Sequence, residues 1–147
     1  MTLLRVTRGL PAAGKTTLAR EWVAANPSDR VRVNRDDLRA MMYMSHIHGV
    51  TEFQVINARD FLILAMLRSG HDVICDDTNL PPRTMRGLRK LATKAGASIE
   101  VIDLTHMSLD ECLRRNAARL DKPPVPEAVI RDMHAQYLAG TSQLDVV

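Results

Sequence analysis

The sequence predicts an α/β protein in which helices cover both faces of a parallel sheet. Apolar runs of strand length alternate with segments of helical periodicity, in the order βαβααβαβαα. Parallel strands joined by helices need right-handed crossovers, which place helices on the two faces. With 147 residues, of which 46% are hydrophobic, the chain is long enough for one core, and we expect 1–147 to form a single domain.

The first half of the chain is expected to hold two strands and three helices. The first helix follows a glycine-bearing turn, and Asn26-Pro27 ends it. Thr51 and Gln54 fit a capping box that opens the third helix, and Gly70 closes it. The expected strands are 3–6 and 31–33, and the expected helices are 15–25, one that begins with "DDLRAMMYM" at 36–44, and 51–69.

The second half is expected to hold two further strands and three further helices. Pro81-Pro82 begins a helix that Gly96 ends. Ser108 and Glu111 fit a second capping box, and the rigid "DKPPVP" separates the last two helices. The expected strands are 72–75 and 98–104, and the expected helices are 81–95, 108–120 and 126–138.

Composition restricts the classes of partner. The net charge of +3 and the isoelectric point near 9.2 permit a phosphate-rich partner. Because the chain has few aromatic residues, we do not expect it to bind nucleic acid mainly by base stacking. Two cysteines form no disulfide framework, and neither a signal peptide nor a membrane-spanning run is visible, so we expect a cytoplasmic location and no membrane partner.

The segment "GLPAAGKTT" matches the phosphate-binding pattern G-x-x-x-x-G-K-[ST] between an expected strand and an expected helix. Backbone N–H groups of such a loop face phosphate oxygens, and the helix N-terminus adds positive charge. Lys15 is expected to reach the β- and γ-phosphates of ATP, and the Thr16 hydroxyl to bind Mg²⁺. The expected nucleotide-binding residues are Gly9, Leu10, Pro11, Ala12, Ala13, Gly14, Lys15, Thr16 and Thr17.

Two acidic pairs follow strands, at the sheet edge where ligands bind in such folds. Asp36 and Arg39 are three residues apart on one helix face, an arrangement suited to holding a substrate hydroxyl beside a substrate phosphate. The alternative is an acidic N-cap turn with a solvated arginine. Asp37 points elsewhere and favours the helix N-terminus.

The second acidic pair lies in "VICDDTNL". From spacing alone, either Asp76 or Asp77 serves as the carboxylate near the metal. Thr78 and Asn79 are expected to line the acceptor site, and the alternative is an Asx-turn that leads into the following prolines.

Basic and apolar residues on three other segments allow two interpretations each. Arg115 and Arg119, four apart, form either a solvated face or a mobile lid that closes over a triphosphate. The helix "RTMRGLRKLATK" favours a solvated face, with a nucleic-acid track as the alternative. "MMYM" at 41–44 favours core filling over an apolar wall for a base. His46 and His48 are interpreted as solvated, because no third metal ligand accompanies them.

The chain resembles the kinase domain of bacteriophage polynucleotide 5′-hydroxyl kinases. The resemblance covers most of the chain and rests on four segments in the same order, "GLPAAGKTTLAREWVAANP", "VNRDDLR", "CDDTNLPP" and "LRRNAARLDKPPVPEAVIRDM". It implies an adenylate-kinase-like P-loop kinase fold, with a four-stranded parallel sheet of order 2-3-1-4 and a helical lid at about 108–126. It also implies transfer of the ATP γ-phosphate, with Mg²⁺, to the 5′-OH of DNA or RNA in end healing and repair.

The resemblance implies roles for individual residues. Asp36 is expected to be the general base on the 5′-OH, and Arg39 to bind the acceptor phosphate. Asp77 matches the family aspartate near Thr16 and is expected to hold Mg²⁺ through water. The other implied residues are Lys15 at the ATP phosphates, and Arg115 and Arg119 as lid arginines.

Two other functions stay open. A P-loop small-molecule kinase, acting on an antibiotic, a sugar or a nucleoside, needs the same phosphate loop. A nucleotide-gated binding module needs no catalytic aspartate outside that loop, and the sequence has no N-K-x-D guanine motif. The D-x-D-G-T motif of the 3′-phosphatase domain that accompanies well-known members is also absent, so 3′-phosphate removal is not expected.

Overall fold

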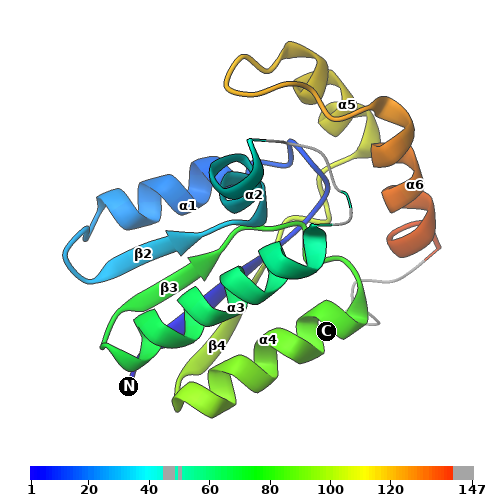
Figure 1. Cartoon of the computed structure of the whole chain (residues 1–147). Helices are drawn as coiled ribbons and strands as arrows, with labels where there is room; N and C mark the ends of the chain where they lie inside the picture. The colour runs from blue at the N-terminus through cyan, green and yellow to red at the C-terminus, as the bar shows by residue number, and fades with distance from the viewer. Residues whose placement is uncertain (45–48, 50, 141–147) are drawn as a thin grey trace.

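A computed structural model of the chain describes residues 1–44, 49 and 51–140, and His46 and His48 lie outside these ranges. Four strands and six helices alternate along the described residues (Figure 1). The strands are β1 (Leu3–Arg8), β2 (Arg30–Val33), β3 (Asp72–Cys75) and β4 (Ser98–Asp103). The helices are α1 (Lys15–Ala24), α2 (Arg35–Tyr43), α3 (Glu52–Arg68), α4 (Pro82–Ala95), α5 (Leu109–Ala118) and α6 (Glu127–Tyr137).

The strands form one parallel sheet, as the sequence pattern predicts, with the order β2-β3-β1-β4 that the family resemblance implies. Val6 pairs with Cys75, and Val33 pairs with Cys75 from the other side. The sheet is parallel because helices join successive strands and return the chain to its starting edge. The carboxyl ends of all four strands therefore meet at one edge, where the loops that follow them gather.

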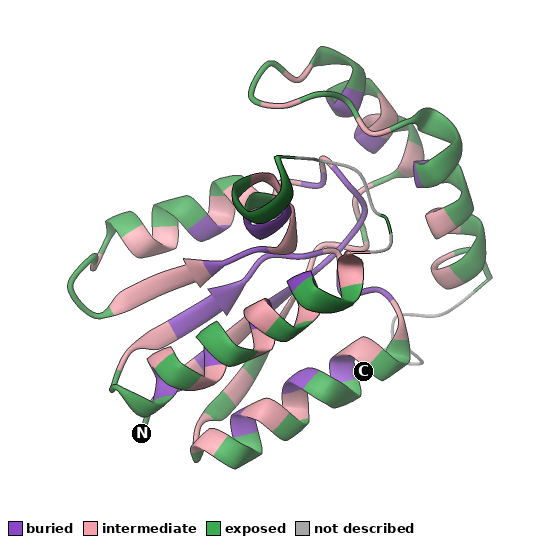
Figure 2. Cartoon of the chain, viewed as in Figure 1, coloured by how far each residue is buried: buried purple, intermediate pink, exposed green. Residues whose placement is uncertain are grey.

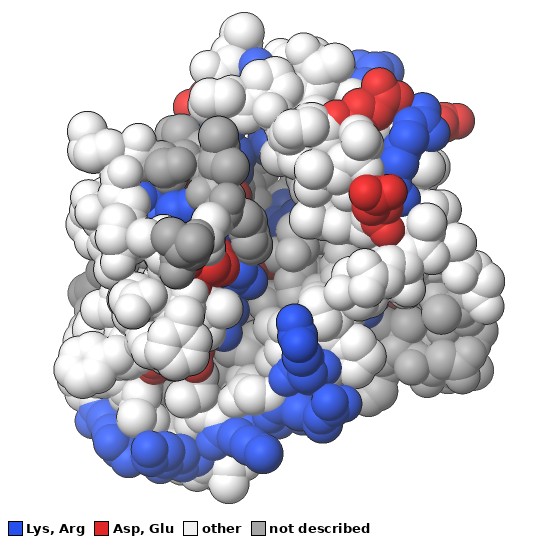
Figure 3. Space-filling view, turned by 45° about the vertical axis from the view of Figure 1, so that its right-hand side comes forward, with Lys and Arg blue, Asp and Glu red and all other residues white. Residues whose placement is uncertain are grey.

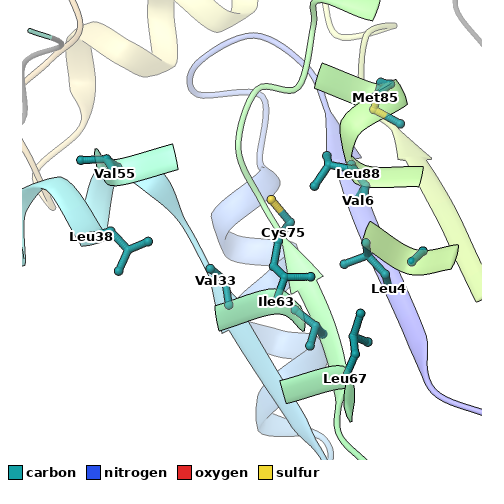
Figure 4. Packing of buried hydrophobic residues seen from close by; sticks show 12 residues of the cluster. Leu4, Val6, Val33, Leu38, Val55, Ile63, Leu67, Cys75, Met85 and Leu88 are labelled. Atoms are coloured by element: carbon teal, nitrogen blue, oxygen red, sulfur yellow. The ribbon is translucent and has the colours of Figure 1, made fainter. Parts of the chain in front are cut away.

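The main core lies between the sheet and the helices α3 and α4 (Figures 1 and 4). Leu4 and Val6 of β1 are fully buried and pack with Ile63 of α3 and Leu88 of α4. Because side chains alternate along a strand, Arg5 lies on the opposite face, where its guanidinium stacks over Trp22 of α1 at 5.3 Å. Helices therefore cover both faces of the sheet, and burial is concentrated in β1, β3 and the inner sides of α3 and α4 (Figure 2).

Helices α5 and α6, with the connection 119–126, form a unit beyond the carboxyl edge of the sheet (Figure 1). We call this the α5–α6 unit. A second apolar cluster holds it against the phosphate loop and the loop after β3, through the buried Leu10, Leu80, Cys112 and Ile130. This packing brings the basic residues of α5 close to the start of α1.

Three local expectations differ from the structure. The Thr51 side chain makes no cap bond, whereas the Ser108 hydroxyl accepts from the Glu111 N–H at 3.1 Å as predicted. Helix α5 ends at Ala118, so Arg119 lies just beyond the helix. The segment "MMYM" does not fill the core, because Met41 and Met44 are 71% and 90% exposed.

None of the described helices has the length and apolar character needed to cross a membrane.

Candidate active site

The phosphate loop joins β1 to α1 and curls back on itself. The Gly9 N–H donates to the Thr78 carbonyl at 3.1 Å, which ties the loop to the end of β3. Gly14 has φ of 101°, a left-handed conformation that glycine adopts freely. Ala12 has φ of 66°, where an alanine costs about 1–2 kcal/mol. The tight turn directs the chain so that α1 begins at Lys15, with its N-terminal N–H groups at the loop.

Lys15 is the loop's cation and is 7% exposed. Its ammonium group donates to the Leu10 carbonyl at 2.5 Å and lies across the loop. Burial lowers the pKa of Lys15 from 10.5 to about 8, although Asp76 acts to raise it. A phosphate anion bound in the loop would favour the charged ammonium, so the site is built to gain attraction when a nucleotide enters.

Asp76 is the carboxylate beside the phosphate loop. Its Oδ2 accepts from the Thr16 hydroxyl at 3.0 Å and from Arg32 Nε at 2.9 Å. Its Oδ1 is buried and makes no hydrogen bond to any described residue. A hydroxyl, a carboxylate and a free buried oxygen together suit Mg²⁺, which prefers oxygen ligands and retains several waters. The residues that fit a bound Mg²⁺ are therefore Thr16 and Asp76.

The expectation that Asp77 lies near Thr16 is wrong, because its side chain points the other way. Asp77 is 7% exposed, and its Oδ1 accepts from the Arg35 N–H at 2.7 Å. Its Oδ2 lies 3.3 Å from Arg59 Nη1 on α3. Adjacent residues in extended chain point to opposite sides, so only one of the two aspartates can face α1. Asp77 instead links β3 to the start of α2 and to α3.

Replacing Asp77 with asparagine is expected to affect mainly stability, and replacing Asp76 is expected to affect mainly phosphate transfer. Asp77→Asn removes one of the two carboxylates that pair with the buried Arg59 guanidinium, the other being Asp60, and we expect the free energy of unfolding to fall by about 1 to 3 kcal/mol. Burial raises the pKa of Asp76, so the charge of this carboxylate is already disfavoured, and Asp76→Asn leaves Arg32 paired with Asp37. We therefore expect Asp76→Asn to cost less stability and to lower phosphate transfer about 10- to 100-fold. Urea unfolding and a Mg²⁺ titration of transfer measure the two effects. A stability loss in Asp76→Asn as large as that in Asp77→Asn would contradict this division.

Asp36 and Arg39 contact each other, as their spacing predicts, but Arg39 is not open to a phosphate. Its Nη1 donates to Asp36 Oδ1 at 2.8 Å, and its Nε and Nη2 each donate to the Glu52 carboxylate at 2.8 Å. The Arg39 side chain is 1% exposed. This differs from the expectation that Arg39 binds the acceptor phosphate, because the Glu52 carboxylate already accepts hydrogen bonds from the Nε and Nη2 atoms of the Arg39 guanidinium. Arg39 is placed to orient Asp36.

Sequence reasoning missed Glu52, which joins two arginines of α2 at the first turn of α3. Arg35 Nε donates to Glu52 Oε1 at 2.8 Å, so Arg35 has the same acidic partner as Arg39. Glu52 lies 13 residues from Arg39, and no local periodicity connects them. An acidic residue in the first turn of a helix is commonly explained by the helix dipole alone, so the sequence offers no reason to expect that Glu52 contacts two arginines.

Lys122 of the α5–α6 unit also contacts Asp36, with Nζ 2.9 Å from Oδ2. Burial acts to raise the pKa of Asp36, but Lys122 and Arg39 outweigh it and lower that pKa from 3.8 to about 2. Asp36 is therefore a carboxylate at neutral pH, held from two sides and 42% exposed. Lys122 had no predicted role, because it lies 86 residues from Asp36 in the sequence.

Replacing Lys122 with methionine is expected to move both limbs of the pH profile of kcat/KM for ATP to higher pH. The pKa of Asp36 rises without its ammonium partner, so the carboxylate forms only at higher pH. The pKa of Lys15 also rises, because Lys122 repels its positive charge. The measurement is the pH–rate profile, with Arg131→Gln as a control. An acid limb that stays in place or moves to lower pH would contradict the Asp36 assignment.

Thr78 and Asn79 were predicted to line the acceptor site, and the structure gives Asn79 a structural contact. The Asn79 Nδ2 donates to the Thr7 carbonyl at 2.9 Å and to the Asp77 carbonyl at 3.2 Å. Asn79 is 2% exposed and has φ of 48°. Its side chain faces the backbone, in line with the turn alternative, while Thr78 is half-buried and its carbonyl holds Gly9.

Arg115 and Arg119 of the α5–α6 unit differ in their surroundings, and Arg115 lies near the phosphate loop. Arg115 Nη1 is 3.9 Å from the position that a Cβ of Gly14 would take, and its Nε donates to Glu111 at 2.8 Å. Arg119 Nε and Nη1 are buried and form no hydrogen bond to a described residue, since Asp121 lies 3.6 Å from Nε. Arg119 is therefore a half-buried cation with a long ion pair to Asp121, and its Nε and Nη1 donors are available to an anion.

A hollow lies between the α5–α6 unit and the rest of the domain. Figure 3 shows this hollow, with Lys, Arg, Asp and Glu side chains inside it. Lys15, Asp36 and Lys122 are near enough for the charges of the last two to act on the pKa of Lys15. The arrangement provides a phosphate loop, a fixed carboxylate and several cations around one space. Such a set suits transfer of a phosphoryl group to a hydroxyl.

Comparisons with known proteins agree with this fold. The 27% identical L-seryl-tRNA(Sec) kinase of Methanococcus maripaludis aligns over 138 residues, which are 92% of this chain and 52% of that protein. A chain in the structure of the Pnkp1/Rnl/Hen1 RNA repair complex is 26% identical, with a TM-score of 0.79 over 92% of this chain and 43% of that chain. This chain thus spans about half the length of these proteins.

A third similarity concerns the fold alone. The Mycobacterium tuberculosis APS kinase CysC, solved with AMPPNP and APS, is 16% identical, with a TM-score of 0.66 over 80% of this chain and 69% of that chain. The family model AAA_33, described as an AAA domain, matches residues 4–139. The chain therefore belongs to this AAA domain family, and its fold is that of the P-loop kinases.

Proposed function

We propose that this chain is a polynucleotide 5′-hydroxyl kinase that transfers the γ-phosphate of ATP to the 5′-OH end of DNA or RNA. One observation carries the proposal: an ionised Asp36 carboxylate, fixed by Arg39 and Lys122, lies near enough to Lys15 of the phosphate loop to act on its pKa. A gating module has no need of such a carboxylate. The similarity to a chain of an RNA repair complex supports nucleic acid as the acceptor.

The chemical step needs Asp36 as the group that holds the hydroxyl. The 5′-OH donates a hydrogen bond to Asp36, its oxygen attacks the γ-phosphorus, and the bond to the leaving ADP oxygen breaks with its electron pair. The pKa of Asp36 near 2 makes it a weak base, so the proton passes to it late, as the new P–O bond forms. Late transfer suits the loose transition state of phosphoryl transfer, in which the nucleophile carries little charge early on.

Cations from both sides of the hollow would stabilise the transferring group. Lys15 would hold the β- and γ-phosphates from the loop, and Arg119 and Arg115 would contact them from the α5–α6 unit, which acts as a lid. Thr16 and Asp76 would hold Mg²⁺, which supplies charge neutralisation at the phosphate oxygens when bound. Two buried donors of Arg119 that make no hydrogen bond to a described residue support anion binding by this lid.

A second candidate function is a kinase for another hydroxyl substrate. The curated relative at 27% identity is a kinase for L-seryl-tRNA(Sec), and the APS kinase shares the fold. Such a substrate would use the same Asp36 carboxylate and the same phosphate loop. The two candidates therefore differ only in the acceptor, and acceptor choice is what the experiment must measure.

The test is transfer of labelled γ-phosphate to a panel of acceptors under ATP and Mg²⁺. The panel holds 5′-OH DNA and RNA oligonucleotides, seryl-tRNA, nucleosides, sugars and aminoglycosides. We expect the oligonucleotides to have the highest kcat/KM. Labelling of a small molecule or of seryl-tRNA in preference to every oligonucleotide would replace the proposal with the second candidate.

A further inference from the structure

Helix α4 carries an unusual concentration of positive charge. Its 14 residues, "PRTMRGLRKLATKA", include no Asp or Glu. Arg83, Arg86, Lys90 and Lys94 are exposed and Arg89 is half-buried. The opposite side of the helix packs into the core through Met85, Leu88 and Ala92. We call the five basic residues the α4 basic face.

The charges of the α4 basic face are not neutralised within the protein. In the part of the chain that the structure describes, none of the five forms a salt bridge or a side-chain hydrogen bond. The exposed arginines of α5 and α6 behave differently: Arg114 pairs with Glu111 and Arg131 pairs with Glu127, three and four residues away. Each of these two arginines has an acidic partner within one turn of its own helix, whereas α4 contains no acidic residue that could serve as one.

The position of α4 connects its surface with the candidate active site. The helix begins directly after the loop 76–81, which carries Asp76 and Asp77 at the carboxyl edge of the sheet. Arg8 Nη2 donates to the Leu80 carbonyl at 2.7 Å and fixes the loop where α4 starts. In Figure 3, Lys and Arg side chains extend along the lower margin of the view, where α4 lies, and rise toward the hollow.

The dimensions of α4 match a short stretch of nucleic acid. A helix of 14 residues is about 21 Å long. At about 3.4 Å per stacked nucleotide, it spans about six phosphates of one strand. Rows of lysine and arginine bind the backbone without reading sequence, by releasing counterions from the phosphates.

We propose that the α4 basic face binds the phosphate backbone of the acceptor strand, beyond the terminal nucleotide whose 5′-OH enters the hollow. The inference rests on the proposed polynucleotide kinase function and extends it from the reacting end to the rest of the strand. A small-molecule acceptor has no backbone to place there. A polynucleotide whose end lies at Asp36 has a repeating row of anions next to it, which is the partner that five unpaired cations fit.

The experiment compares a long acceptor with a short one in two variants of equal charge loss. Arg86→Gln/Lys90→Gln/Lys94→Gln removes three charges from α4. Arg20→Gln/Arg114→Gln/Arg131→Gln removes three exposed charges from α1, α5 and α6 as the control. The acceptors are a 5′-OH 12-mer and a nucleoside 3′-monophosphate, and binding of a fluorescent 12-mer is followed by anisotropy without ATP.

We expect the α4 variant to lose about 10- to 100-fold in kcat/KM for the 12-mer, through KM, and to keep its activity on the nucleoside 3′-monophosphate. The slope of log affinity against log salt should fall by about 2, since each single-strand phosphate contact contributes about 0.7. The control variant should match the wild type with both acceptors. Thermal melting of both variants shows that the fold is kept.

Two results would overturn the inference: anisotropy that is the same for the wild type and the α4 variant, or an equal loss in the control variant. Failure of the proposed function has a different signature. If the wild type binds the 12-mer in an α4-dependent way but phosphorylates neither acceptor, the kinase proposal fails while nucleic-acid binding by α4 stands.

Discussion

Replacing Asp36 with asparagine is expected to lower phosphate transfer about 10²- to 10⁴-fold while ATP affinity changes little. The amide keeps the size of the carboxylate but loses the charge that Arg39 and Lys122 hold in place. It cannot take the proton of the attacking hydroxyl. The measurement is single-turnover transfer at saturating ATP, together with the Kd for a non-hydrolysable ATP analogue.

The neighbouring aspartate offers a matched control for this substitution. Asp37 pairs with Arg32, its backbone N–H is capped by Asn34 Oδ1 at 3.0 Å, and its side chain is 55% exposed. Asp37→Asn removes the same charge from the same helix turn, and we expect nearly unchanged transfer. A loss of ATP binding in Asp36→Asn as large as the loss of transfer would place Asp36 in the nucleotide site instead.

Replacing Arg119 with alanine is expected to lower kcat about 10²- to 10³-fold with a smaller change in KM for ATP. Its Nε and Nη1 are buried without a hydrogen bond to a described residue, and the ion pair with Asp121 is long at 3.6 Å, so both donors are desolvated and available to an anion. Charge that develops on the transferring phosphoryl group gains most from such preorganised donors. Steady-state kinetics over a range of ATP concentrations separates the effect on kcat from that on KM.

Arg114 is the control for this second substitution. It lies on the same helix as Arg115, is 69% exposed and pairs only with Glu111 among the described residues. Arg114→Ala removes the same charge from the α5–α6 unit without touching the hollow, and kcat should stay near the wild-type value. Equal kinetics for Arg119→Ala and Arg114→Ala would return Arg119 to a purely structural role.

Much of the fold was predictable from the sequence because the signals that specify it are local. Strand and helix periodicities, prolines and terminal glycines give the order of elements, and the pattern of the phosphate loop fixes the strand–loop–helix at its start. The strand order β2-β3-β1-β4 followed from the family resemblance and is confirmed. The helix end at Ala118 was missed because "NAARL" has good helix formers on both sides of it.

The contacts within the candidate site were less predictable, because they join distant residues. Which of Asp76 and Asp77 contacts Thr16 depends on which side of the extended chain faces α1. Two adjacent aspartates in a sequence do not indicate which of them faces that side. Glu52 and Lys122 reach Asp36 and Arg39 only through the tertiary fold. The exposed "MMYM" was assigned to the core because apolar residues usually fill it. The phage origin and the single-domain organisation of 1–147 stay predictions.

The central claim is that the hydroxyl held by Asp36 is the 5′-OH of a polynucleotide. The most direct test supplies labelled ATP and Mg²⁺ with two oligonucleotides of the same sequence, one with a free 5′-OH and one with that oxygen methylated. We predict that the free end is labelled, that the methylated one is not, and that a 5′-phosphatase removes the label. Labelling of both oligonucleotides, or of neither, would contradict the claim.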